Sequence, residues 1–224
     1  MESDVSLLLV SEGLQRVDER RPPRRQVAGG ERHQRQEHRH ADEDRGIGAG
    51  DLRHDAREDV LADRPRAAQA ECENADVAPT AGNEGIVRAA ILCLHNQIRS
   101  NRGLPLLREN ARLRRAAAAH SADMVSRGFF EHTTPSGVTM VDRIMATRYT
   151  SPRVGWAFGE NLAWGTGSLA TPRSIMKAWM ESSGHRANVV RRAYREIGIG
   201  IVTGVPSDRD AGATYTADFG VVRR

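Results

Sequence analysis

Lysine and aromatic residues are scarce in this chain of 224 residues, and their positions divide it. Lys177 is the only lysine, so arginine supplies nearly all of the positive charge. None of the ten aromatic residues precedes Phe129, and the first 66 residues contain none. Because aromatic side chains contribute much of the apolar area that protein cores bury, we expect the packed core in the later part of the chain.

Neither sign of charge dominates. The first 66 residues carry 13 Arg and 15 Asp or Glu, a net charge of −2. The remainder carries 20 Lys or Arg and 14 Asp or Glu, a net charge of +6, which gives +4 for the whole chain. No stretch interleaves basic and aromatic residues in the manner of a nucleic-acid binder. We therefore expect no nucleic-acid partner.

Long hydrophobic runs are also missing. A transmembrane helix needs about 20 predominantly apolar residues, and no stretch of the sequence provides them. The longest early apolar run, Leu7–Val10, is too short for the hydrophobic core of a signal peptide. The sequence as it stands predicts neither a membrane span nor a secretion signal.

Residues 1–70 are expected to be disordered. Within them, Glu19–Arg66 mixes charges of both signs with Gly, Pro and four of the eight histidines, and such a composition buries too little apolar area to fold. His33, His38 and His40 are a candidate metal cluster, but the composition favours a solvated polar tail. A third interpretation is that this N-terminal segment is not native. Its Arg-, His-, Asp- and Ala-rich composition resembles the product of a GC-rich gene read in a wrong frame or from an over-extended start.

The domain expected over residues 71–224 combines helices with strands. Apolar periodicity predicts helices over about 84–102, 109–127 and 139–147, and another from Thr171-Pro172 to Ser182-Ser183-Gly184. Strands are expected in the GENLAWG stretch (159–165) and over 196–203 and 213–222. Gly198 and Gly200 share one face of their strand, which indicates that another element packs closely against the backbone there. Helices followed by a few antiparallel strands indicate an α+β fold.

Familiar catalytic motifs are absent from the sequence. It contains no Gly-x-Ser-x-Gly elbow, phosphate-binding loop, dinucleotide fingerprint or His-Glu-x-x-His. The two cysteines, Cys72 and Cys93, are too far apart for a Cys-x-x-Cys motif. A disulfide between them would contribute about 3 kcal/mol in the chain-entropy account, and two free thiols are the alternative.

Three polar residues lie at the edges of apolar elements, where clefts form: His132, Glu160 and His185. Two imidazoles and a carboxylate can hold zinc in an open three-ligand site. They can equally form a hydrogen-bonded polar network, which the spacing alone favours. His120 lies on the apolar face of its expected helix and is interpreted as a hydrogen-bonded core histidine.

Five motifs in order make the sequence similar to a known family. They are His95-Asn96-x-x-Arg99, His132, GENLAWG, the segment from Trp179 to Asn188, and Ile197–Gly200 together with Asp218-Phe219-Gly220. Over roughly residues 72–222 the chain resembles the SCP/CAP superfamily, which includes cysteine-rich secretory, antigen-five and pathogenesis-related proteins. The form here is similar to the bacterial extracellular branch.

The resemblance implies a three-layer α-β-α sandwich with a small antiparallel sheet between helices. It also implies that His132, Glu160 and His185 converge in one solvent-reachable cleft. Eukaryotic members carry a second glutamate, for which Glu181 is the candidate here. Glu181 is offset by one position from that pattern, about 100° around a helix, so we expect it to point elsewhere.

An extracellular or cell-envelope location, implied by the same resemblance, favours the Cys72–Cys93 disulfide. The expected function is a binding domain whose cleft takes a divalent metal or a small ligand. It needs no nucleophile, and none is evident, so we favour a binding protein over an enzyme. We expect no required cofactor, with zinc or another divalent cation as the candidate. The expected partner is a small ligand, a lipid or a cell-wall component. We expect the protein to be a monomer.

The alternative function is a metal-dependent, peptidase-like hydrolase. In this interpretation zinc on His132 and His185 activates water, and Glu160 serves as the general base. An open catalytic zinc normally has three protein ligands, and Glu160 cannot be both the third ligand and a free base. The sequence therefore ranks this alternative second.

Overall fold

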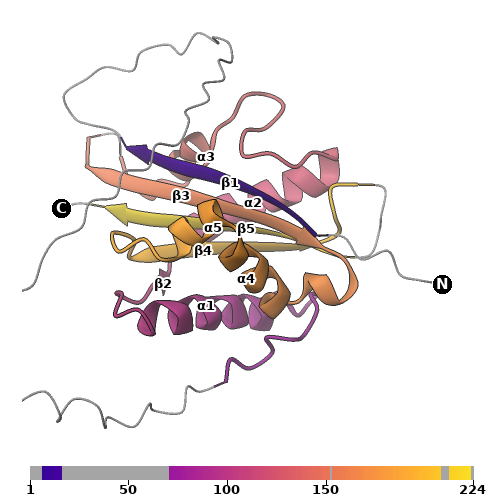
Figure 1. The fold of residues 1–224 in the computed structure, drawn as a ribbon. Coiled ribbons are helices and arrows are strands. Elements are labelled where there is room, and N and C mark those ends of the chain that lie inside the picture. Colours follow the sequence, from indigo (N-terminus) through magenta and orange to yellow (C-terminus); the bar gives the residue numbers. More distant parts are fainter. Residues whose placement is uncertain (1–6, 17–70, 152, 208–211, 223–224) are drawn as a thin grey trace, which may run out of the picture. The chain divides into compact units, whose positions relative to one another are not determined.

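The computed structural model describes residues 7–16, 71–151, 153–207 and 212–222, and only the backbone of residues 7–16. One mixed sheet organises them in the strand order β1-β3-β5-β4-β2 (Figure 1). The strands are β1 (Leu7–Arg16), β2 (Arg108–Glu109), β3 (Trp156–Gly165), β4 (Glu196–Thr203) and β5 (Ala213–Val222). Neighbouring strands are antiparallel except for the two-residue β2, which is parallel to β4.

Helices cover both faces of this sheet (Figure 1). They are α1 (Glu84–Ser100), α2 (Ala111–Arg127), α3 (Met140–Ala146), α4 (Pro172–Glu181) and α5 (Ser183–Val189), with a short 3₁₀ turn, η1 (Gly167–Ala170), before α4. α2 and α3 pack on one face, and α1, α4 and α5 on the other. The α+β, α-β-α sandwich expected from the sequence is confirmed.

The two faces of β4 pack differently. Ile197 and Ile199 point toward α1 and α4 and join the larger cluster of buried apolar side chains. Gly198, between them, points toward α2, where a Cβ atom would overlap the main chain of Leu113 and Arg114. The close approach predicted for the strand glycines is confirmed, since α2 lies directly on the backbone of β4.

Two helix boundaries follow the sequence signals and one does not. Gly128 ends α2 in the left-handed conformation, and the Thr171 side chain caps α4 by accepting from Ser174 N. The helix that starts at Pro172 was expected to end at Ser182-Ser183-Gly184. Instead the backbone turns out of helical geometry at Ser182 and resumes at once as α5, a helix that the sequence reasoning missed.

The motif in α1 has a structural role. Arg99 is fully buried and donates from its guanidinium to main-chain carbonyls of Pro105, Val189, Arg191 and Tyr194. His95 donates from Nδ1 to the carbonyl oxygen of Ile91, four residues earlier. Burial lowers the pKa of His95 to about 4, so its imidazole is neutral at physiological pH. Arg99 thus ties α1 to the end of α5 and the segment that follows it, while the His95 hydrogen bond stays within α1.

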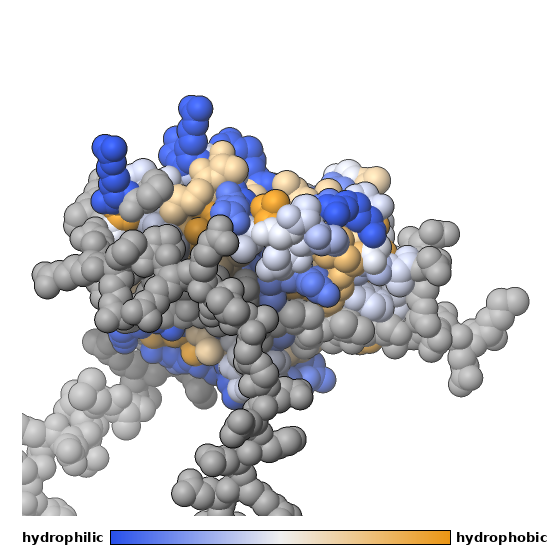
Figure 2. All heavy atoms as spheres, turned by 90° about the horizontal axis from the view of Figure 1, so that it is seen from above, coloured by the Kyte–Doolittle hydropathy of each residue, from blue (hydrophilic) through white to orange (hydrophobic). Residues whose placement is uncertain are grey.

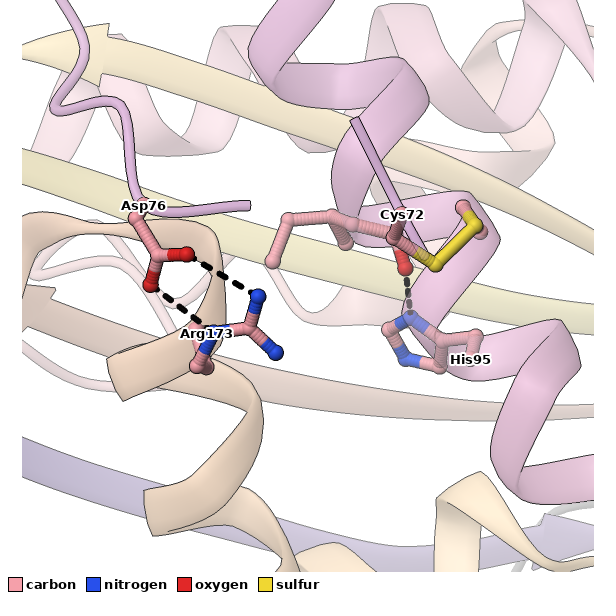
Figure 3. The surroundings of a disulfide bond; sticks show 6 residues. Cys72, Asp76, His95 and Arg173 are labelled. Carbon is pink, nitrogen blue, oxygen red and sulfur yellow. Dashed lines mark hydrogen bonds and ion pairs between the residues drawn. A yellow bond between two sulfur atoms is a disulfide. The ribbon is translucent and has the colours of Figure 1, made fainter. Parts of the chain in front are cut away.

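Cys72 and Cys93 form a disulfide, with their Cα atoms 5.7 Å apart, as expected (Figure 3). The bond joins the segment before α1 to the middle of that helix. Asp76 and Arg173 form a two-hydrogen-bond ion pair nearby, which links the same segment to α4. The start of the globular domain is therefore attached to α1 and α4 together.

Replacing both cysteines by serine is expected to lower the free energy of unfolding by about 3 kcal/mol, because the unfolded chain then regains the freedom of a 21-residue loop. Urea unfolding of the oxidised wild type and the double variant measures the difference. Wild type with a reductant is the matched control and is expected to behave like the variant. Equal stabilities of the oxidised and reduced wild type would contradict the prediction.

β1 departs from the sequence expectation. Residues 1–70 were expected to be disordered, but Leu7–Arg16 form a strand that pairs with β3 from Leu7 opposite Gly165 to Arg16 opposite Ala157. The candidate cluster His33, His38 and His40 lies outside the described residues. The division of the chain at residue 70 stays a prediction.

Exposed large hydrophobic side chains are few in the described segments. They belong to four separate places in the chain: Val77, Ile86, Leu106 and Val138. On the face shown in Figure 2, hydrophobic residues form small groups among hydrophilic ones wherever the surface is not grey. None of the described helices combines the length and the apolar composition needed to cross a bilayer.

Candidate functional site

Glu160, in the middle of β3, is a fully buried carboxylate held from two sides. His132 donates from Nδ1 to Oε1 at 2.7 Å, and Arg143 pairs with Oε2 at 2.7 Å. Glu160 shares its face of the strand with Phe158, which packs in the core beneath α2 and α3. The carboxylate therefore faces the α2–α3 layer and not open solvent.

Arg143 contacts both Glu160 and the main chain of His132. Arg143 lies on α3, and its Nη1 also donates to the main-chain carbonyl of His132 at 2.8 Å. α3 is held at its start by a capping box in which Thr139 and Asp142 exchange hydrogen bonds. The loop carrying His132 and the helix carrying Arg143 are thus locked together around Glu160.

Asp218 is a second fully buried carboxyl group, opposite Glu160 on the neighbouring strand β5. Burial and the charge of Glu160 raise the pKa of Asp218 well above its usual range. Burial also raises the pKa of Glu160, but the hydrogen bond from His132 and the charge of Arg143 outweigh it and lower that pKa to about 2. Glu160 is therefore ionised at neutral pH, whereas burial and the charge of Glu160 favour the neutral form of Asp218.

His120, on α2, belongs to the same buried polar group. Its Nε2 donates to the carbonyl oxygen of Glu131 at 3.0 Å, which confirms the expected hydrogen-bonded core histidine. Burial lowers its pKa to about 4, although the nearby charge of Glu160 acts in the opposite direction. The neutral ring therefore adds no positive charge to the group at physiological pH.

His185 approaches β3 from the opposite face. Its main-chain carbonyl accepts a hydrogen bond from Asn161 Nδ2, and Asn161 directly follows Glu160. Successive side chains of a strand point to opposite faces, so α5 and the main chain of His185 lie on the face of β3 opposite the Glu160 side chain. The His185 ring shares a 2.7 Å hydrogen bond between Nδ1 and Ser182 Oγ.

The structure thus joins two of the three predicted residues directly. His132 contacts Glu160, and the backbone of His185 lies beside the next residue along β3. Glu160 itself is fully buried, with an exposed fraction of 0%, and the expected solvent-reachable groove beside it stays a prediction. The Glu181 side chain is 68% exposed and pairs with Lys177 at 3.9 Å, which agrees with a position outside the buried polar group.

A zinc site with three protein ligands does not fit the described side chains. Glu160 already accepts from His132 and from the cationic Arg143, so it orients His132 and does not offer itself to a metal. Both histidines have Nδ1 engaged, an arrangement that typically directs Nε2 toward a metal. Even so, no group of three or more His, Cys, Asp or Glu side chains in the described part of the chain is arranged to hold one.

Three members of the buried group were not assigned to it from the sequence: Arg143, Asp218 and His120. Each gave a local signal. Asp218 interrupts an apolar strand, Arg143 lies between the apolar positions of a short helix, and His120 lies on an apolar helix face. These signals show that a polar side chain is buried, but not which residue lies opposite it.

The protein is an α-β-α sandwich with a histidine hydrogen-bonded to a buried carboxylate. This is the class of protein that the sequence motifs indicate. The family described as "CAP: Cysteine-rich secretory protein family" matches residues 92–218, more than half of the chain. This protein therefore belongs to the CAP family.

Similar proteins come from bacteria. The chain is 31% identical over 126 residues to the uncharacterised protein YkwD of Bacillus subtilis, covering 56% of this chain and 44% of YkwD. It is 27% identical to an extracellular protein containing a SCP domain from Bacillus anthracis, covering 65% and 45% of the two chains with a TM-score of 0.48. The chain thus spans less than half the length of either relative.

An outer surface protein of Borrelia burgdorferi shares the fold. The TM-score is 0.52 at 16% identity, over 65% of this chain and 98% of that one. At this identity the likeness concerns the fold alone.

Proposed function

We propose that this protein is an extracellular or cell-envelope binding domain whose ligand site lies at β3, between His132 and His185. The carrying observation is the buried Glu160, which holds His132 in one orientation through a 2.7 Å hydrogen bond. Burying a charged network is costly unless it is fully paired, so such a group at the edge of an apolar core supports a role beyond packing. The extracellular location rests on the family, whose description names secretory proteins.

The geometry supports binding more than hydrolysis. A general base works best with a pKa near the working pH, whereas the pKa of Glu160 is lowered to about 2, despite burial, by His132 and Arg143. Both of its oxygens are already engaged. Glu160 therefore serves to orient His132, and the hydrolase alternative lacks its base.

A divalent cation remains one candidate ligand, and it would be held by the two histidine rings. Two imidazoles are fewer than the three protein ligands of a typical zinc site, so we expect weak binding completed by water or by an organic ligand. His132→Gln with His185→Gln tests this. Glutamine keeps an N–H donor for Glu160 but removes the imidazole.

Titration calorimetry with zinc chloride on the full chain measures the outcome. The double variant is expected to lose the heat of binding that the wild type shows. The matched control replaces His33, His38 and His40 by asparagine, which removes the other histidine cluster of the chain and is expected to leave the heat unchanged. Loss of heat only in the control would assign zinc binding to that cluster and refute the metal site at β3.

A further inference from the structure

β1 covers the outer edge of the strand that carries Glu160. It pairs antiparallel with β3 along nearly the whole length of that strand, with Glu12 opposite Glu160 and Ser11 opposite Asn161. The register shifts once, between Glu12 and Gln15. Figure 1 shows β1 at the border of the sheet, next to β3. β1 therefore runs beside β3 at Glu160 and Asn161, the residues that contact His132 and His185.

The other edge of β3 is already taken, since β5 pairs with it from Trp156 to Gly165. Without β1, β3 would be the border strand and would present a row of unpaired N–H and C=O groups. All ten residues of β3 are buried, and a buried main-chain group without a partner is costly. β1 therefore supplies partners for main-chain groups of β3 that would otherwise line an open sheet edge.

The two sides of this edge are formed by residues of the candidate site. On one face of the sheet, His132 and Arg143 contact the side chain of Glu160. On the other face, α5 packs against both β3 and β1, and the Asn161 side chain binds the carbonyl of His185. An extended chain between these two sides satisfies the main chain of β3 by backbone hydrogen bonds, which any sequence can make.

We propose that the edge of β3 between His132 and α5 is a binding site for an extended peptide, which adds to the sheet as a strand, and that residues 7–16 occupy it in cis. This inference rests on the proposed function and names the ligand class of the same site. Strand addition is a recurring mode of peptide recognition, in which main-chain hydrogen bonds give affinity and flanking side chains give specificity.

Competition between the tethered segment and a free peptide makes the proposal measurable. A segment tethered to its own site acts at an effective concentration that reaches about millimolar. A free peptide of residues 5–18 should therefore bind the wild-type chain weakly. It should bind at least about ten times more tightly when β1 is prevented from pairing.

The blocking variant is Leu8→Pro with Leu9→Pro in the full chain. Successive N–H groups of a strand point to opposite edges, so one of these two prolines removes a donor that faces β3. The probe is the fluorescently labelled peptide VSLLLVSEGLQRVD, and anisotropy gives its dissociation constant. The matched control peptide carries the same two prolines and is expected not to bind.

Hydrogen exchange on the wild type gives an independent test that needs no variant. Amides of residues 7–16 and of β3 are expected to be protected, and β3 is expected to lose protection in the proline variant while β4 and β5 keep it. Exchange of residues 7–16 at the unprotected rate in wild type would overturn the proposal. Equal binding of the strand peptide and the proline peptide would also overturn it. Either result leaves the zinc titration unaffected, so failure here is distinguishable from failure of the proposed function.

Discussion

Gly198→Ala is expected to lower the free energy of unfolding by more than about 4 kcal/mol or to prevent folding, because it places a methyl group inside a main-chain contact. The added Cβ would overlap the backbone of Leu113 and Arg114. Backbone atoms cannot rotate away as a flexible side chain does, so α2 must lift from the sheet. Leu113 belongs to the core that this helix shares with Phe158, and that core would open.

The matched control makes the same chemical change where space is available. Gly85 lies in the first turn of α1, and its added Cβ would meet only Arg88 Nη2, at 3.9 Å. Alanine is favoured over glycine in a helix by about 0.5–1 kcal/mol, so Gly85→Ala is expected to be neutral or stabilising. Urea unfolding followed by circular dichroism measures both variants. A Gly198→Ala protein within about 1 kcal/mol of wild type, on the order of an ordinary surface change, would contradict the close packing of α2 on β4.

The glycine pair also shows what the sequence could predict. Alternation of isoleucine and glycine in β4 indicated which face is apolar and which is approached closely, and the predicted bounds, 196–203, agree with the structure. Such a pattern is local, so it can be read without knowing how the rest of the chain folds. The identity of the element that approaches, α2, is a tertiary fact that no local pattern carries.

Elements that depend on distant pairing were missed for the same reason. β2 has two residues and exists because Arg108 and Glu109 pair with the start of β4. β1 was missed because its surroundings have the composition of a disordered chain, and its pairing partner, β3, lies far along the sequence. α5 was missed because Ser182-Ser183-Gly184 has the composition of a helix end, while the structure restarts the helix after one non-helical residue.

In the candidate site, too, local features were predicted from the sequence and tertiary contacts were not. The motifs identified His132 and Glu160, which contact each other. The exposed Glu181 agrees with the offset argument, which rests on helix rotation, a local property. Arg143 was missed because its role comes from the position of α3 over the sheet. That arginine decides the electrostatics of the buried group, which gives the second prediction.

Arg143→Met is expected to destabilise the protein by about 3–5 kcal/mol at neutral pH, because it leaves a buried carboxylate without its cation. The Arg143 side chain is only 9% exposed and Glu160 is fully buried, so water cannot replace the lost partner. Asp218, opposite Glu160 on the adjacent strand, is a carboxyl group and supplies no positive charge. Adding Glu160→Gln to the variant removes the stranded charge and should recover part of the loss.

Arg173→Met is the matched control. Arg173 makes two hydrogen bonds to Asp76, at 2.8 and 2.9 Å, so the geometry of its ion pair is at least as good. Both side chains are largely exposed, however, and exposed pairs contribute little. The control is therefore expected to unfold close to wild type.

The pH dependence separates a lost charge partner from lost packing. In wild type the pKa of Glu160 is lowered to about 2. Its ionised form therefore contributes stability that is fully present above the pKa of the unfolded state and is lost as the pH falls through about 2. Without Arg143, burial is expected to raise that pKa above the unfolded value of about 4.5. The variant then regains stability as the pH falls toward that value, because the carboxyl group becomes neutral. His95 titrates in both proteins, so its contribution cancels in the difference. The charge of Arg143 lowers the pKa of His120 in wild type, so the loss of Arg143 raises that pKa and changes the stability difference in the same direction. The stability gap measured by urea unfolding should therefore narrow from pH 7 to about pH 4.5, whereas a gap that stays constant would show that Arg143 acts through packing alone.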